Sequence, residues 1–138
     1  MSADFIDSNI LVYVFDKTDS RKSGIAADLV RRGQDEGTMI ISFQVIQETL
    51  NVLTRKLKVS ADDARLFMEV ALVPLWGVMP SQGLYQSALE TQASRGFSFY
   101  DALIVASALE ADCSRLYTED LEHGQKIGRL TICNPFRK

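Results

Sequence analysis

The chain has 138 residues, of which 46% are hydrophobic and 24% are charged, as in globular domains. This length allows one domain over residues 1–138 with a core of its own and excludes two full-sized ones. The formal net charge of −3 is unlike the basic charge of a simple DNA- or RNA-coating protein. Two bound divalent cations would reverse the sign of that charge, so metal-dependent action on nucleic acid stays open.

Targeting and membrane segments are not expected. Asp4 and Asp7 interrupt the apolar N-terminal run, and no basic stretch precedes it. The longest uncharged run, residues 70–89, contains prolines and glycines and does not suit a membrane span. Cys113 and Cys133 match no metal spacing and are expected to be reduced thiols. The sequence therefore predicts a cytoplasmic protein with no membrane partner.

Short apolar runs along the chain predict the strands. The first run ends in an acid, Asp7, and the fourth is followed by two, Glu119 and Asp120. The third contains Trp76, whose ring we expect in the core. The predicted strands cover residues 3–7, 38–41, 73–79, 114–118 and 130–133.

Helical periodicity and capping residues predict helices between these strands. Ser42 and Ser60 are N-caps, and Gly37 ends the preceding helix in the C′ position. The predicted helices cover residues 10–15, 24–36, 43–58, 60–72, 81–94 and 98–111. Because strands alternate with helices, we expect an α/β fold on a mainly parallel sheet of about five strands, with helices on both faces.

The helix at 98–111 is unusual because Asp101 is its one charge between Arg95 and Glu110. A helix that is apolar on every side is expected to be buried. Ser98 is a good N-cap, which places Asp101 in the first turn, where the helix dipole favours a carboxylate. The Ser98-x-x-Asp101 pattern is also that of a capping box, and a capped helix end can hold a carboxylate at a site.

Four isolated acids are predicted to lie at the carboxyl edge of the sheet, where such folds bind ligands. Asp7 and Asp120 follow strands, Asp101 begins a helix after a loop on this edge, and Glu48 lies about two turns into another helix. Carboxylates without basic partners repel one another unless hard cations such as Mg²⁺ or Mn²⁺ lie among their oxygens. These ions activate water for attack on phosphorus.

Several other kinds of site are excluded. His123 is the single histidine, which excludes a two-histidine acid–base ribonuclease and disfavours a zinc site. The chain also lacks the glycine-rich motifs of dinucleotide folds and P-loops, and the Gly-x-Ser-x-Gly turn of serine hydrolases.

At four places, in order, the chain resembles the PIN domain family. The blocks are Phe-Ile-Asp7-Ser-Asn-Ile-Leu, Gln-Val-Ile-Gln-Glu48-Thr-Leu, Tyr-Asp101-Ala-Leu-Ile-Val-Ala-Ser-Ala and Tyr-Thr-Glu-Asp120-Leu. The resemblance implies that these acids form a catalytic and metal-binding quartet. Asp7 and Asp101 would be inner-sphere ligands, while Glu48 and Asp120 would complete the site directly or through water.

The chain is most similar to the small VapC-like toxins of bacterial toxin–antitoxin pairs. The resemblance implies a three-layer α/β/α PIN-like sandwich and an Mg²⁺- or Mn²⁺-dependent endoribonuclease. Such an enzyme hydrolyses RNA to a 5′-phosphate and a 3′-hydroxyl. The family also implies a homodimer and a small antitoxin protein as partner.

Neighbours of the quartet also match the family blocks. Ser8 and Asn9 occupy small polar positions that would orient the first acid, and Thr118 fits the Thr-x-Asp form of the last block. The resemblance leaves Glu119 either as a helper or as a solvated neighbour.

Two other functions remain open from the sequence. A catalytically silent RNA- or protein-binding module would keep the same acids. A phosphatase or phosphoacceptor domain is disfavoured, because a dehalogenase-like nucleophile would need a second Asp where Asn9 stands. Phosphate contacts could come from seven basic residues, of which the sequence singles out none: Arg21, Lys22, Arg55, Lys56, Arg95, Lys126 and Arg129.

Overall fold

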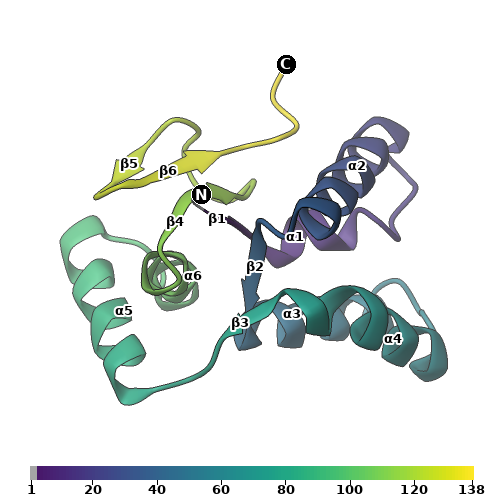
Figure 1. Cartoon of the computed structure of the whole chain (residues 1–138), viewed down its shortest axis with the longest axis horizontal. Coiled ribbons are helices and arrows are strands. Elements are labelled where there is room, and N and C mark those ends of the chain that lie inside the picture. The colour runs from purple at the N-terminus through teal and green to yellow at the C-terminus, as the bar shows by residue number, and fades with distance from the viewer. Residues whose placement is uncertain (1–2) are drawn as a thin grey trace.

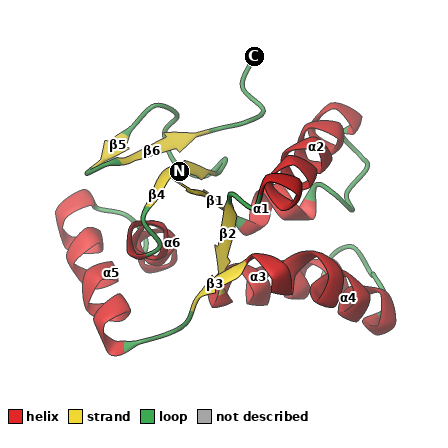
Figure 2. Ribbon diagram, viewed as in Figure 1, coloured by secondary structure: helices red, strands yellow, loops and turns green. Residues whose placement is uncertain are grey.

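Helices and strands alternate through residues 3–138, the part of the chain that the computed structural model describes (Figures 1 and 2). The strands are β1 Ala3–Ile6, β2 Met39–Ser42, β3 Trp76–Val78, β4 Cys113–Tyr117, β5 Lys126–Ile127 and β6 Leu130–Cys133. Within the described residues they form one six-stranded sheet in the order β3-β2-β1-β4-β6-β5. Every pairing is parallel except that of β5 with β6. The predicted mainly parallel sheet is confirmed.

The strand that the sequence pattern missed is β5. Its two residues are too few to show any alternation of apolar and polar side chains. A tight turn at Gly128, where φ is +60°, returns the chain to β6 and makes the pairing antiparallel.

Helices cover both sides of the sheet, with α5 and α6 on one side and α1 to α4 on the other (Figure 1). Their bounds are α1 Ser8–Val12, α2 Ser20–Glu36, α3 Phe43–Arg55, α4 Ala61–Phe67, α5 Gln82–Arg95 and α6 Phe99–Glu110. The predicted N-caps are confirmed, since the hydroxyl oxygens of Ser42, Ser60 and Ser98 each accept a backbone N–H three residues on. None of the helices in residues 3–138 combines the length and the apolar character needed to cross a membrane.

Several boundaries differ from the sequence prediction: the predicted helix 10–15 is Ser8–Val12, and the predicted helix 43–58 ends at Arg55. Helix α2 begins at Ser20 rather than residue 24, because the Asp19 carboxylate accepts the Lys22 N–H as an N-cap. The predicted helix 60–72 ends as a π-helical turn, and Pro74 lies in a short 3₁₀ turn, so only Trp76–Val78 of the predicted strand 73–79 is extended. Trp76, which was expected in the core, is 41% exposed as a residue.

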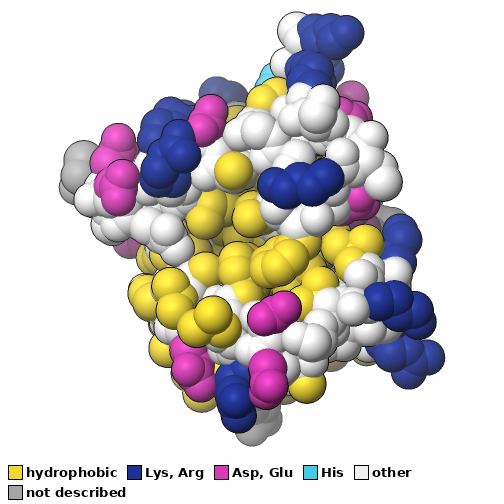
Figure 3. Space-filling view, turned by 90° about the vertical axis from the view of Figure 1, so that its right-hand side faces the viewer, with side chains coloured by type: hydrophobic (Ala, Val, Ile, Leu, Met, Phe, Trp, Pro, Cys, Tyr) yellow, Lys and Arg dark blue, Asp and Glu magenta, His cyan; other side chains and the backbone are white. Residues whose placement is uncertain are grey.

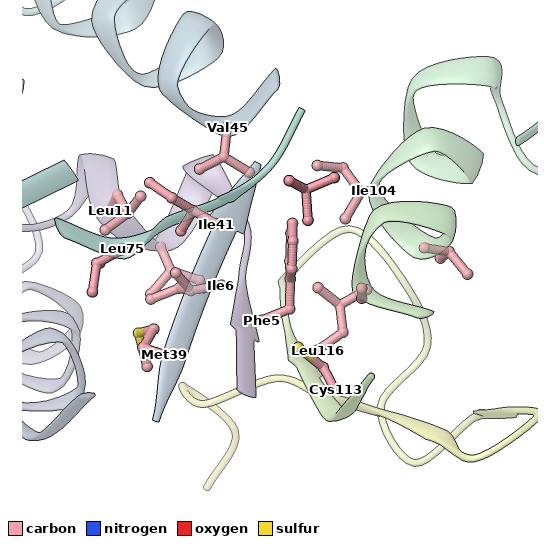
Figure 4. Close-up of a cluster of buried hydrophobic side chains, with 14 of the residues drawn as sticks. Phe5, Ile6, Leu11, Met39, Ile41, Val45, Leu75, Ile104, Cys113 and Leu116 are labelled. Carbon is pink, nitrogen blue, oxygen red and sulfur yellow. The ribbon is translucent and has the colours of Figure 1, made fainter. Parts of the chain in front are cut away.

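The central strand β1 carries buried side chains on both faces, as expected for a sheet covered on both sides. Figure 4 shows Phe5 on the side of α6, toward Ile104 and Leu116, and Ile6 on the opposite side, toward Met39. Phe5, Ile6 and Leu116 are fully buried. Because β1 lies between β2 and β4, its carboxyl end is the middle of the sheet edge where the candidate acids were predicted.

Helix α6 confirms the expectation from its all-apolar sequence. Every residue from 102 to 108 is buried. Ser107, the polar exception, donates its hydroxyl to the Leu103 carbonyl at 2.8 Å, so the helix needs no outside partner for it. The buried helix fixes the position of its first turn, which carries Asp101.

Candidate functional site

The centre of the candidate site is Asp7, which follows β1 directly and caps α1. Its Oδ1 accepts the Ser8 N–H at 2.7 Å, and its Oδ2 accepts the Thr118 hydroxyl at 2.8 Å. Burial raises the pKa of Asp7 from 3.8 to about 7, and the nearby charges of Asp120 and Glu48 also raise it. The two hydrogen bonds oppose this shift. Asp7 is thus a buried carboxyl that titrates near neutral pH.

Thr118, directly after β4, connects Asp7 to two other parts of the site. Its Oγ1 donates to Asp7 and accepts the Asp120 backbone N–H at 3.1 Å and the Asn9 side-chain amide at 3.4 Å. A hydroxyl has one hydrogen and two lone pairs, so these three bonds use its full capacity. Thr118 therefore orients Asp7 and fixes the start of the loop that carries Asp120.

Glu48 lies in α3 and is held from two sides. The Ser8 hydroxyl lies 3.1 Å from Glu48 Oε1 and 3.4 Å from Asp7 Oδ1, so it bridges the two carboxylates. The side-chain amide of Gln44 donates to Glu48 Oε2 at 3.4 Å and to the Tyr100 carbonyl at 3.1 Å. Gln44 thereby links α3 to the first turn of α6, where Asp101 lies.

Asp101 and Asp120 complete the acidic quartet. Asp101 is half-buried, and its backbone N–H donates to Ser98 Oγ at 3.2 Å. Burial raises the pKa of Asp101, a hydrogen bond with Ser98 lowers it, and the charge of Asp120 raises it. Asp120 is exposed, and its charge acts on both Asp7 and Asp101. Charge interactions therefore link Asp7 to Glu48 and to Asp120, and Asp120 to Asp101.

These acids do not form a closed ligand cage. Within residues 3–138, no three side chains of the His, Cys, Asp and Glu types converge closely enough to hold an ion by themselves. The acids are linked instead through Ser8, Thr118 and Gln44.

Two amide oxygens add to the oxygen-rich character of the site. Asn9 Oδ1 and Gln44 Oε1 are buried and have no hydrogen-bond partner among the described residues. The NH₂ groups of the same two amides are bonded to Thr118 and Glu48. Hard divalent cations are bound by carboxylate and amide oxygens, so the donor set fits such an ion in its chemistry.

Glu119, whose role the sequence left open, forms an ion pair. Its Oε2 lies 2.5 Å from Lys22 Nζ. Lys22 also packs over the rings of Tyr13 and Phe136, with its Nζ 5.2 and 5.3 Å from the two ring centroids. Glu119 is therefore neutralised by a cation, while the four acids of the quartet lack such a partner among the described ion pairs.

The sequence prediction overlooked Gln44, and it named Lys22 as a possible phosphate contact but not as the partner of Glu119. Gln44 lies one helical turn before Glu48, so its i,i+4 spacing was a usable signal for a contact. No local pattern links Lys22 to Glu119, because they are 97 residues apart in the chain. His123 is exposed, and its Nδ1 accepts the Asn134 backbone N–H, which leaves it outside the acidic site.

Comparison with known proteins identifies one matching family and two structures of similar fold. Residues 5–126 match the family model of the PIN domain. The fold is similar to Mycobacterium tuberculosis VapC20, a sarcin-ricin loop cleaving toxin, with a TM-score of 0.64 and 22% identity over 86% of this chain and 90% of that chain. It is also similar to FitAcB from Neisseria gonorrhoeae, with a TM-score of 0.64 and 14% identity over 98% and 99% of the two chains. None of the curated proteins matches significantly.

Proposed function

The chain belongs to the PIN domain family, and from this premise we propose that it is an endoribonuclease, the toxin of a toxin–antitoxin pair. The observation that carries the proposal is the buried Asp7 carboxyl, which the Ser8 hydroxyl links to Glu48 and the Thr118 hydroxyl links to the loop of Asp120. A site of this kind binds cations readily, because a cation offsets both the burial and the mutual repulsion of the carboxylates.

We propose Mg²⁺, with Mn²⁺ as a substitute, as the cofactor. Asp7 and Asp101 would hold it directly, and Glu48 and Asp120 would do so directly or through water. When bound, such an ion lowers the pKa of a water molecule, orients it against phosphorus and stabilises the leaving oxygen. Hydrolysis would break the bond between phosphorus and the 3′ oxygen, which gives a 5′-phosphate and a 3′-hydroxyl.

The residues around the acids would keep them in position for this reaction. Thr118 and the Ser8 N–H hold the two oxygens of Asp7, and both bonds favour its charged form. Ser8 and Gln44 hold Glu48 beside Asp7. Because these groups are fixed before substrate arrives, little reorganisation is needed during the reaction.

An antitoxin partner is supported by an apolar surface. Figure 3 shows hydrophobic side chains gathered across the middle of one face, with charged side chains beside them and at the rim of the face. A groove of about 380 Å³ lies among Phe15, Leu66, Phe67, Val70 and Ala71. Exposed apolar patches of this kind often bind other proteins. We also propose a homodimer, located in the cytoplasm.

The first experiment is RNA cleavage by the purified, partner-free chain with Mg²⁺, with Mn²⁺ and with excess chelator. Asp101→Asn tests the site, and Asp35→Asn, which removes an exposed acid from α2, is the matched control. Cleavage that requires metal, persists in Asp35→Asn and disappears in Asp101→Asn would support the proposal. RNA that is bound but never cut would favour a silent binding module, and cleavage that survives both chelator and mutation would indicate a contaminating ribonuclease.

A further inference from the structure

A groove leads away from the candidate site between α1 and the second half of α3. It has a volume of about 240 Å³ and begins at Ser8 and Asn9, beside the acids. Val12 and Val52 line it farther along, and Lys56 lies at the end of α3. The groove is smaller than the roughly 300 Å³ at which pockets for drug-sized ligands begin. It suits one flat ring system with an apolar face.

The residues on the α3 side of the groove form a row that starts at the acidic quartet. Glu48, Val52 and Lys56 are spaced four residues apart, so they lie along one face of the helix. Lys56 is therefore about 12 Å from Glu48 along the helix axis, at about 1.5 Å per residue. A stacked nucleic-acid strand covers such a distance in a few nucleotides, at about 3.4 Å each.

The charged side chains that line the groove are Lys56, Asp16 and Glu119. The ion pairs of the described residues do not include Lys56, but its charge lies near that of Asp16 and, after the hydrogen bonds from Thr18, helps to lower the pKa of that carboxyl. Glu119, which also lines the groove, is neutralised by Lys22. Asp16 is the remaining acid, and its Oδ1 accepts the Thr18 N–H and hydroxyl. A carboxylate there would repel a phosphate but accept an amino group from a base edge.

We propose that this groove binds the RNA strand next to the bond that is cut, with one base against Val12 and Val52 and with Lys56 on a phosphate a few nucleotides from that bond. The inference rests on the proposed ribonuclease function, because an endonuclease must hold the strand on both sides of the cut. Lys56 would act on substrate binding rather than on the chemical step.

Lys56 also caps α3, and the effect of this cap on stability must be separated from the effect of Lys56 on RNA binding. It is the C-cap of α3, where a positive charge interacts favourably with the helix dipole. Lys56→Arg keeps the charge at both places, so it should preserve RNA binding. Equal thermal unfolding midpoints for Lys56→Ala and its parent would exclude loss of fold as the reason for any loss of binding.

The test uses a fluorescently labelled single-stranded RNA and the full chain carrying Asp101→Asn, with chelator present so that nothing is cut. In this background Lys56→Ala should weaken binding about fivefold or more and lower the log–log salt slope by about 0.7, the value for one contact to a single strand. Lys138→Ala removes an exposed lysine that is not among the candidate phosphate contacts and is the matched control, expected to bind as the parent does.

A second variant tests the groove itself without changing charge. In the protein that retains Asp101, Val52→Phe should fill the groove and raise KM while kcat changes little. The variant would lose binding energy that is the same in the ground state and in the transition state. Lys56→Ala should behave in the same way. With an RNA shortened on the groove side of the cut, Lys56→Ala and its parent should have the same KM, because the phosphate that Lys56 would contact is absent.

The outcomes separate this inference from the proposed function. If the parent neither binds nor cuts RNA, the ribonuclease proposal fails, and this inference fails with it. If the parent binds and cuts RNA, but Lys56→Ala and Val52→Phe leave affinity, salt slope and KM unchanged, the groove inference alone is wrong. A groove that serves a protein partner instead would give this second result.

Discussion

The surroundings of Asp7 make the stability of the folded protein depend on the protonation of this side chain. The folded protein raises the pKa of Asp7 from 3.8 to about 7, so the folded state binds a proton more tightly than the unfolded state does. The contribution of Asp7 to stability is therefore greatest below about pH 4 and decreases as pH rises through 7. A divalent cation would offset this loss, because it stabilises the charged form.

Replacing the charge should therefore separate stability from activity. Asp7→Asn is expected to abolish RNA cleavage and, without metal, to raise the thermal unfolding midpoint at pH 8 relative to the parent. The difference should shrink at pH 5, because the parent carboxyl is then mostly protonated. Thermal unfolding in chelator at the two pH values measures it. An equal difference at both pH values would show that Asp7 does not titrate as described.

Thr118 is expected to act as a positioning residue. Thr118→Val keeps the side-chain shape but removes the donor to Asp7 and the acceptor for the Asp120 N–H. Because the bond to Asp7 lowers its pKa, its loss should raise that pKa and shift the acidic limb of the pH–rate profile upward. A drop in kcat of about tenfold or more is expected, corresponding to about 1.4 kcal/mol.

The control for this variant is Thr131→Val, which makes the same change on β6 away from the acids. It should leave the pH–rate profile unchanged. If Thr118→Val lowered activity without moving the profile, Thr118 would stabilise the fold without tuning Asp7.

At the scale of elements, two close contacts determine how helices approach the sheet. Helix α2 packs against β2 at Gly33, where a Cβ atom would lie 2.6 Å from Met39 Cβ. Helix α6 is buried from Ala102 to Ala108, and Ser98 caps the first turn, which carries Asp101. Because backbone and core positions are close-packed, such contacts leave little room for adjustment.

Gly33→Ala should therefore destabilise the protein by about 1–3 kcal/mol, the usual cost of overpacking a core. Gly24→Ala lies in the same helix, where the added Cβ meets nothing within 4 Å, and should be neutral or stabilising because alanine favours helix. Urea unfolding of both variants measures the contrast. Equal effects would indicate that α2 can move away from β2 at little cost.

At the scale of the whole molecule, the end of the chain is tied to the beginning beside the candidate site. Arg21 donates to the Phe136 carbonyl at 2.5 Å, and the Phe136 ring packs edge-on against Tyr13 with centroids 5.0 Å apart. Lys22 lies over both rings and binds Glu119 in the loop after β4. The segment near residue 136 therefore supports the loop that carries Asp120.

Phe136→Ala should lower stability by about 3–5 kcal/mol, as loss of a buried ring does. It should also speed amide hydrogen exchange at residues 118–120, because the Lys22–Glu119 pair loses one of its packing partners. Phe136→Leu keeps an apolar side chain and should show a smaller effect on both. Unchanged exchange at 118–120 in Phe136→Ala would show that the loop is held without this support.

Local patterns in the sequence determined much of the fold. The caps at Ser42, Ser60 and Ser98, the Gly37 helix end, the buried helix α6 and the parallel sheet follow from short-range rules and are confirmed. The strand at residues 73–79 was predicted too long, because the π-helical turn before Pro74 has no clear local signature. The shared sheet edge of Asp7 and Asp120 follows from parallel topology.

Tertiary structure alone decided how those acids are connected and which charges remain unpaired. The Thr118 hydrogen bonds to Asp7 and Asn9 join residues 111 and 109 positions apart, and the Lys22–Glu119 pair joins residues 97 apart. Whether a charge is buried, neutralised or free depends on such long-range contacts, which no local spacing encodes. The sequence therefore determined which side chains could act, while packing determined that Asp7 is buried, Glu119 is paired and Lys56 is left beside an open groove.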